Sequence, residues 1–275
     1  MSVGGELCAR FVAGARGRIF CLLHKPAAAS GTAVLIVPPL AEEMNKSRKM
    51  LAQVAQGLAA RGRAALIVDL FGTGDSEGEF RDAQWSCWKS DLAAGADWSA
   101  SLGWPVRSML ATRVGCILAG EMARERDLAL ERTVFWQPTG SASRWLDQFL
   151  RLRVAASMVD SASPETVAAL RARLRAGEVV EVAGYEITGE LAAALDGAQL
   201  APNIGAQLGA VRWMEVVRSA DAAVPGASTA LIDAARAQGR SVDVETFVGE
   251  PFWASTEIVC IPSLVERTVE SLGAA

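Results

Sequence analysis

Short apolar runs alternate with amphipathic segments of helical period along most of the chain. Residues 6–12 and 18–24 flank the turn-forming stretch 13–17 and predict a β-hairpin. Further apolar runs predict buried strands at 32–37, 64–70, 106–112, 132–136, 211–217 and 242–248. Helical patterns lie between or after them, at 47–61, 84–99, 115–123, 228–238 and 262–272. Strands that alternate with helices predict an α/β fold with a doubly wound, mostly parallel sheet.

The pattern changes between residues 141 and 209, where strand signals are sparse and Ala- and Arg-rich helical stretches dominate. One helix is expected to start at Ser163-Pro164-Glu165 and to stop at Gly177. A short strand at 179–182 precedes a helix at 189–195, which Thr188 is expected to cap. We therefore expect a core formed by residues 1–140 and 210–275, with residues 141–209 inserted as a helical lid.

The stretch from Val106 to Ala123 has the order strand, sharp turn, helix. That order is the frame of a nucleophile elbow, in which a Ser, Cys or Asp is held at the tip of the turn. The elbow pattern G-x-S-x-G, aligned onto residues 111–115, keeps small residues at both ends, Ala111 and Gly115, and puts Arg113 at the tip. The frame is therefore present without its nucleophile.

Composition removes several classes of function. The net charge of −4 argues against general nucleic-acid binding, and five scattered cysteines without C-x-x-C spacing favour a reduced protein. No long apolar core typical of a signal peptide or a transmembrane helix is present, so we expect a cytoplasmic protein. His24 is the one histidine, which excludes most metal sites and most proton relays. We expect neither metal nor cofactor.

In such a sheet, ligands collect where the parallel strands end. Residues 38–45, 71–76 and 112–115 arrive there, as do the loops after Val217 and Val248. The segment from Asp69 to Ser76 reads D-x-x-G-x-G-x-S, and residues 218–225 end in an Asp221-x-x-Val-Pro pattern. Together these features resemble the α/β-hydrolase superfamily over nearly the whole chain. The resemblance implies that Asp221 occupies the position of the triad acid.

Three longer motifs resemble a narrower family. They are Pro38 to Arg48, Ala183 to Glu186, and Gly249 to Trp253. They are similar to the second hydrolase type associated with exosortase A systems, which is found with exopolysaccharide and protein-sorting loci. This resemblance implies a protein partner in such a pathway.

Two of the three triad positions lack the required chemistry. Arginine stays protonated and cannot attack a carbonyl, and Phe252 stands where the superfamily has its histidine. Cys116 is favoured as a packed thiol, Ser76 and Ser108 have no base to activate them, and His24 belongs to the distant hairpin.

A guanidinium at a helix N-terminus faces the positive end of the helix dipole, so an anion is expected beside Arg113. Asp221, Glu42, Glu43 or an anionic ligand could supply it. The candidate ligand-binding residues are Arg113, Leu40, Glu42, Glu43, Val114, Phe252 and Trp253.

Three hypotheses remain open. The first is a binding or accessory protein without triad catalysis that takes a small-molecule, acyl or anionic ligand. The second is an ester or thioester hydrolase that uses a carboxylate from Asp75, Glu42, Glu43 or Asp221 as a general base. The third is an obligate subunit whose lid forms a partner surface.

Overall fold

The computed structural model describes residues 5–27, 31–160 and 165–273. Within them an eight-stranded sheet has the order β1-β2-β4-β3-β5-β6-β9-β10. Strand β2 is antiparallel to both of its neighbours, and the strands from β4 to β10 are parallel. The strands are β1 (Glu6–Ala13), β2 (Arg18–Lys25), β3 (Ala33–Val37), β4 (Ala64–Val68), β5 (Val106–Thr112), β6 (Arg132–Trp136), β9 (Ala210–Val217) and β10 (Val242–Val248).

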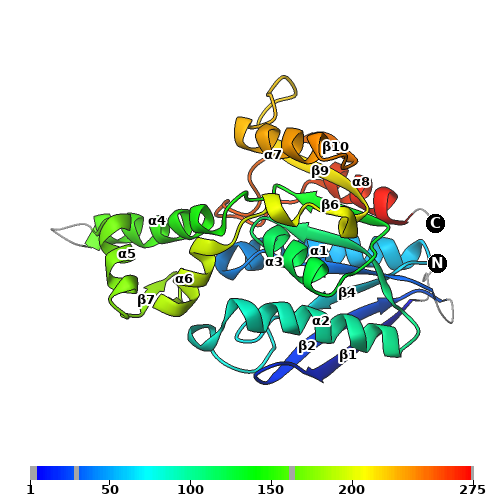
Figure 1. Ribbon diagram of the computed structural model, residues 1–275, viewed down its shortest axis with the longest axis horizontal. Helices are drawn as coiled ribbons and strands as arrows, with labels where there is room; N and C mark the ends of the chain where they lie inside the picture. Colours follow the sequence, from blue (N-terminus) through cyan, green and yellow to red (C-terminus); the bar gives the residue numbers. More distant parts are fainter. Residues whose placement is uncertain (1–4, 28–30, 161–164, 274–275) are drawn as a thin grey trace.

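Helices cover both faces of the sheet (Figure 1). One face packs against α1 (Ala41–Ala60) and α8 (Pro262–Gly273), and the other against α2 (Trp85–Ser101), α3 (Gly115–Glu125) and α7 (Gly226–Ala237). Alternate residues of β3 serve the two layers, since Leu35 faces one hydrophobic cluster and Ile36 faces the other. The predicted α/β class with a doubly wound, mostly parallel sheet is confirmed.

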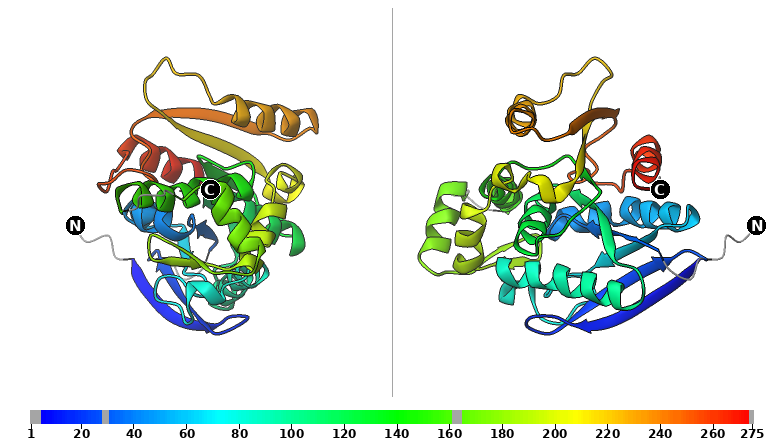
Figure 2. Two further views of the ribbon diagram at one scale, coloured as in Figure 1. Left: turned by 90° about the vertical axis from the view of Figure 1, so that its left-hand side faces the viewer. Right: turned by 45° about the vertical axis from the view of Figure 1, so that its right-hand side comes forward.

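The segment between β6 and β9 extends beyond one end of the sheet (Figures 1 and 2). It contains α4 (Ala142–Asp160), α5 (Val167–Arg175), a hairpin of β7 (Val180–Val182) and β8 (Tyr185–Ile187), and α6 (Gly189–Gly197). The short helices η2 (Ala201–Asn203) and η3 (Ala206–Leu208) lead into β9, and η1 (Phe80–Asp82) precedes α2. A lid function for the segment inserted between β6 and β9 remains a prediction.

The ends of α5 and α6 can be compared with the helix signals expected from the sequence. Thr188 caps α6, because its hydroxyl accepts a hydrogen bond of 3.2 Å from the Leu191 N–H. Gly177 follows α5 with φ +85°, as expected of a helix stop. The start signal expected at Ser163 and Pro164 lies outside the described residues, and the observed cap of α5 is Thr166, which accepts from Ala169 N.

The largest error in the sequence-based elements concerns the start of α1. We expected a strand-end loop over residues 38–45 and a helix from residue 47, but the helix begins at Ala41. Glu42 and Glu43 therefore lie in its first turn, where carboxylates interact favourably with the helix dipole. Two adjacent prolines and the charged run that follows concealed this start.

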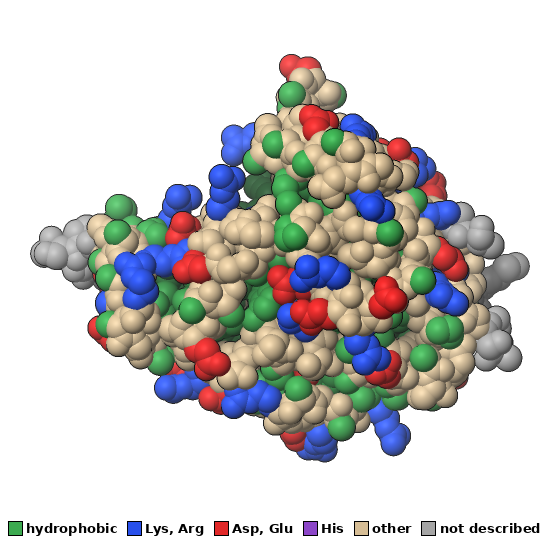
Figure 3. All heavy atoms as spheres, viewed as in Figure 1, with side chains coloured by type: hydrophobic (Ala, Val, Ile, Leu, Met, Phe, Trp, Pro, Cys, Tyr) green, Lys and Arg blue, Asp and Glu red, His purple; other side chains and the backbone are tan. Residues whose placement is uncertain are grey.

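Within the described residues no helix is long and apolar enough to cross a membrane. Basic and acidic side chains are interspersed on the face drawn in Figure 3. That face therefore has no broad region of a single charge sign.

Candidate functional site

Arg113 occupies the tip of the turn that joins β5 to α3. Its backbone has φ 57°, a left-handed conformation that is uncommon for a residue with a side chain. Its N–H donates to the Trp136 carbonyl at 2.9 Å, and its carbonyl accepts from Cys116 N at 3.1 Å. A Cβ atom at Gly115 would lie 2.4 Å from the Pro38 carbonyl oxygen, so only glycine allows α3 to start this close to the end of β3. The turn has the geometry of a nucleophile elbow.

Arg113 is 7% exposed, and its guanidinium contacts four neighbours. Its Nε and Nη2 donate to the two carboxylate oxygens of Glu43 at 3.3 and 3.2 Å. Nη2 also donates to Gln148 Oε1 at 3.1 Å, and Nη1 donates to the Gln137 carbonyl at 3.4 Å. The indole ring of Trp253 lies 4.7 Å from its Cζ, within the range of a cation–π interaction.

Glu43 is the anion that the sequence required beside Arg113. Burial raises the pKa of its carboxyl group, while the charge and hydrogen bonds of Arg113 oppose that rise. The first turn of α1 supplies a favourable dipole for the ionised form. Glu42, the adjacent acid, instead pairs with Lys46 at 3.4 Å.

A cavity of about 490 Å³ opens above this pair. Its lining comes from the start of α1, the turns after β5 and β6, the loop after β10 and the inserted helix α4. Three of its charged lining residues are basic (Lys46, Arg113 and Arg151) and two are acidic (Glu42 and Glu43). The apolar part is formed by Phe149, Leu152 and Trp253. A cavity with these walls can hold an apolar group and a nearby negative charge.

Residues of the first and third unusual sequence motifs line this cavity, and the second motif is hydrogen-bonded to the first. Glu43 comes from the first motif, and Trp253, from the third, lies over the Arg113 that Glu43 binds. Asn45 of the first motif donates from Nδ2 to the hydroxyl of Tyr185, in the second motif, at 2.8 Å. Segments separated by more than 130 residues in the sequence are therefore joined around the first turns of α1.

The other predicted ligand-binding residues are buried. Leu40 and Val114 directly precede α1 and α3, and their side chains are 2% and 0% exposed. Phe252 is 0% exposed and packs edge-to-face against Trp136, with ring centroids 5.9 Å apart. None of the three is among the cavity-lining residues that the structure describes.

Asp221 lies on the loop after β9 and is exposed. A hydrogen bond from the Ser219 side chain lowers the pKa of its carboxyl group. It is not one of the described partners of Arg113, so the ion pair that the sequence left open is made by Glu43 and not by Asp221. A catalytic function for Asp221 remains a prediction.

Cys116, Ser76 and His24 are not arranged to replace the missing nucleophile or base. Cys116 is 0% exposed and burial raises the pKa of its thiol, which keeps it unreactive. Ser76 donates to the Asp69 carbonyl and accepts from Phe20 N, so it supports its loop. His24 pairs in register with Ala65 at the start of β4, whereas Arg113 follows the end of β5, so the two residues lie at opposite ends of the parallel strands.

Sequence reasoning missed the contribution of α4 to the site. Gln148, Arg151 and Leu152 have the i, i+3, i+4 spacing of one helix face. That spacing was visible in the sequence, but nothing there indicated that this face would meet Arg113. It also missed Glu215, a carboxyl group on β9 that is 0% exposed and accepts from Trp213 Nε1 at 2.6 Å.

Comparisons with known proteins agree with the fold. Est1E from Butyrivibrio proteoclasticus with ferulic acid bound superposes with a TM-score of 0.68 at 15% identity, over 95% of this chain and 97% of that one. The esterase domain of a Rhodothermus marinus protein gives 0.61 at 13% identity, over 98% and 96%. An α/β serine hydrolase homologue from Coxiella burnetii gives 0.56 at 13%, over 99% and 98%.

No protein-family model matches the chain, and no curated protein sequence matches it. The solved structures, the strand order and the elbow together define the class: the chain has the α/β-hydrolase fold. Identities of this size establish the fold and leave the activity to the site itself.

Proposed function

We propose that this protein is a cytoplasmic binding or accessory protein that keeps the α/β-hydrolase fold without Ser-His-Asp catalysis. The observation that carries the proposal is Arg113 at the elbow tip, with its guanidinium bound to Glu43. An arginine in this position can orient or attract an anion but cannot form an acyl intermediate. Phe252, packed among aromatic rings, offers no proton acceptor at the position of the histidine.

The ligand class follows from the charges of the cavity. Arg113 is largely neutralised by Glu43 and Lys46 pairs with Glu42, so among the described lining residues the exposed Arg151 is the cation available to an incoming anion. Phe149, Leu152 and Trp253 offer contacts to an apolar or aromatic body. A small aryl or acyl compound with one carboxylate or phosphate group satisfies both requirements.

The convergence of the three motifs supports a more specific proposal. Residues that resemble the exosortase-associated type 2 hydrolases line or brace one cavity, which is the arrangement expected if the cavity serves the function shared by such proteins. The protein would then act with a partner in an exopolysaccharide or exosortase-linked pathway.

The alternative is an active ester or thioester hydrolase with a carboxylate base. Two observations favour it: the structural neighbours include esterases, and burial raises the pKa of Glu43 toward the range useful for a general base. Among the four carboxylates considered, Asp75 and Asp221 are exposed and Glu42 pairs with Lys46, so Glu43 is the one this mechanism would use.

A paired binding and turnover experiment separates the two proposals. Ferulate, which is bound in one structural neighbour, is a suitable carboxylate probe for calorimetric titration. We expect it to bind the wild type and to bind Arg151→Gln about fivefold to tenfold more weakly. Arg144→Gln, an exposed arginine on the same helix that does not line the cavity, is the matched control and should leave binding unchanged.

The same proteins are then tested with p-nitrophenyl esters and acyl thioesters of short and long chains. The binding proposal predicts rates equal to the buffer blank. Turnover that is abolished by Glu43→Gln and retained by Arg113→Gln, with both variants shown by circular dichroism to be folded, would establish the hydrolase instead. Absence of both binding and turnover would reject both proposals.

A further inference from the structure

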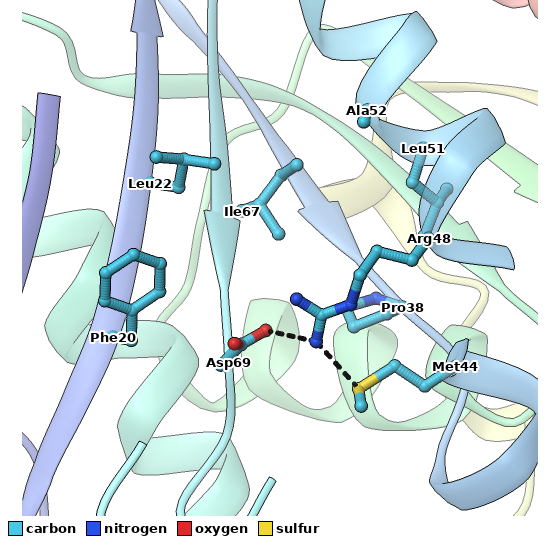
Figure 4. A pocket seen from close by; sticks show the side chains of 9 residues that line it. All are labelled: Phe20, Leu22, Pro38, Met44, Arg48, Leu51, Ala52, Ile67 and Asp69. Carbon is cyan, nitrogen blue, oxygen red and sulfur yellow. Dashed lines mark hydrogen bonds and ion pairs between the residues drawn. The ribbon is translucent and has the colours of Figure 1, made fainter. Parts of the chain in front are cut away.

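A second cavity, of about 230 Å³, lies between α1 and the strands β2 and β4 (Figure 4). The two cavities share no lining residue. Of the nine described residues around the second cavity, seven are apolar and the other two, Arg48 and Asp69, form an ion pair. The function proposed above does not use this apolar trough or its charged end.

The cavity exists because α1 does not extend across the whole sheet. Leu22 of β2 and Ile67 of β4 are partners in register, so their side chains project on the same face. Phe20, two residues before Leu22, continues that apolar row. Opposite it, α1 contributes Met44 and Leu51 at helical spacing. The strand side chains remain half-buried, and the space between strand and helix stays open (Figure 4).

Asp69 is fixed firmly at one end of this trough. It is 3% exposed, and its Oδ2 accepts from Asp75 N at 3.0 Å. Its Oδ1 accepts from Arg48 Nη2 at 3.3 Å. Gly74 makes this arrangement possible, because a Cβ there would lie 2.0 Å from Asp69 Oδ2. With both oxygens engaged, Asp69 orients Arg48 rather than binding a ligand.

Arg48, in contrast, has donors to spare. Its side chain is 48% exposed and uses only Nη2 in the contacts that the structure describes, toward Asp69 and toward the Met44 sulfur at 4.0 Å. A guanidinium has five N–H donors arranged in a fork that matches a carboxylate. The remaining donors have no partner among the described residues, and they lie beside an apolar trough.

We propose that this cavity is a binding site for a medium-chain monocarboxylate. The alkyl chain lies between Leu22, Ile67 and Leu51, and the carboxylate pairs with the free edge of Arg48. Asp69 offsets much of the Arg48 charge, so the unused N–H donors of Arg48 suit a monoanion better than a dianion such as phosphate. A dry cavity of about 150 Å³ holds benzene, so this larger one accommodates roughly six to eight carbons.

The test is a calorimetric titration of the intact protein with hexanoate and octanoate, with octanol and octylamine as headgroup controls. Each buried methylene is worth about a fourfold change in affinity, so octanoate should bind about 15-fold more tightly than hexanoate. Arg48→Gln should weaken octanoate binding about tenfold and leave octanol binding unchanged. Octylamine should not bind.

A cavity-filling variant locates the site. Ala52→Leu places a larger side chain on the cavity wall while keeping a good helix former, and it should reduce octanoate affinity at least tenfold. Gln53→Leu, the exposed neighbour outside the cavity, is the matched control and should leave affinity unchanged.

No octanoate binding, or binding that survives Ala52→Leu, would overturn the proposal. Equal binding of octanoate and octylamine would overturn the assignment to a carboxylate. If Arg151→Gln abolishes octanoate binding, the ligand occupies the Arg113 cavity and the second site is rejected, while the function proposed for the first remains untouched.

Discussion

The Arg113 guanidinium and the Glu43 carboxylate bind each other where a hydrolase would hold its nucleophile and oxyanion hole, through hydrogen bonds of 3.3 and 3.2 Å. Arg113 stands before α3, where the helix dipole disfavours a positive charge, and Glu43 lies in the first turn of α1, where the dipole favours a negative one. The favourable interaction of Glu43 with the dipole of α1 therefore offsets the unfavourable interaction of Arg113 with the dipole of α3.

Breaking this pair should destabilise the fold strongly. Glu43→Gln leaves the Arg113 charge buried with only neutral partners, and we expect the free energy of unfolding in urea to fall by about 3 kcal/mol. Glu42→Gln, which removes a partly exposed i,i+4 pair with Lys46, should cost less than about 0.5 kcal/mol.

The double variant Glu43→Gln/Arg113→Gln distinguishes a charge effect from lost packing. Removing both charges should restore part of the stability lost in Glu43→Gln, because no uncompensated ion remains. If the loss in the double variant equals the sum of the losses in Glu43→Gln and Arg113→Gln, the two residues do not interact energetically and the ion pair has no structural importance.

The contact between α3 and the end of β3 gives a second prediction. Gly115→Ala places a methyl group 2.4 Å from the Pro38 carbonyl oxygen, a backbone atom that cannot rotate away. We expect a loss of about 2 to 4 kcal/mol in the free energy of unfolding. In Gly197→Ala, at the end of α6, the new Cβ meets no atom within 4 Å, and the variant should be as stable as the wild type or about 0.5 kcal/mol more stable. Equal losses in the two variants would mean that the elbow is not tightly packed.

Much of the core could be predicted from the sequence because its signals are local. The strand at 33–37 is apolar at every position, since both faces of β3 are covered by helices. The elbow was also visible, because a strand, an interrupting turn and a small-residue helix follow one another within 20 residues. The sequence alone therefore places Arg113 at the tip of the turn.

The remainder depends on contacts that no local pattern records. The sequence left Asp221, Glu42 and Glu43 as possible partners for Arg113, and the choice is made by the early start of α1, which points one of two adjacent acids inward. The contribution of Gln148 depends on how α4 packs against the core. The cavity at Arg48 depends on which strands α1 leaves uncovered, and this is a property of the whole sheet.

A serine at the elbow tip should not by itself produce an esterase. Arg113→Ser supplies a hydroxyl, but Phe252 is packed between Trp136 and Trp253, and His24 lies at the opposite end of the parallel strands. Without a base within hydrogen-bonding distance the hydroxyl stays unactivated, so we expect p-nitrophenyl ester hydrolysis equal to that of the wild type. Circular dichroism must show that the variant is folded. A clear gain in turnover would reveal a base that the described contacts do not identify.

Glu215 gives a prediction about pH. Burial raises the pKa of this carboxyl group, although hydrogen bonds from Ser228 and Trp213 and the charge of Arg113 oppose the rise. The folded protein therefore retains this proton to a higher pH than the unfolded chain does. The contribution of Glu215 to stability is complete at low pH and is lost as the pH rises from the ordinary pKa of a glutamate to the raised pKa of the folded state.

Glu215→Gln removes this titration and keeps an amide oxygen that can accept from Trp213 Nε1. The stability of the variant relative to the wild type should thus increase with pH, by about 1.4 kcal/mol for each pH unit that separates the folded and unfolded pKa values, and then level off. Urea unfolding from about pH 4 to about pH 8 measures this difference, and the titrations of Glu43 and Asp91, whose pKa values burial also raises, cancel because both proteins share them. Parallel stability curves would show that Glu215 has the same pKa in the folded and unfolded states, and a difference that falls with rising pH would mean that its ionised form is the one the fold stabilises.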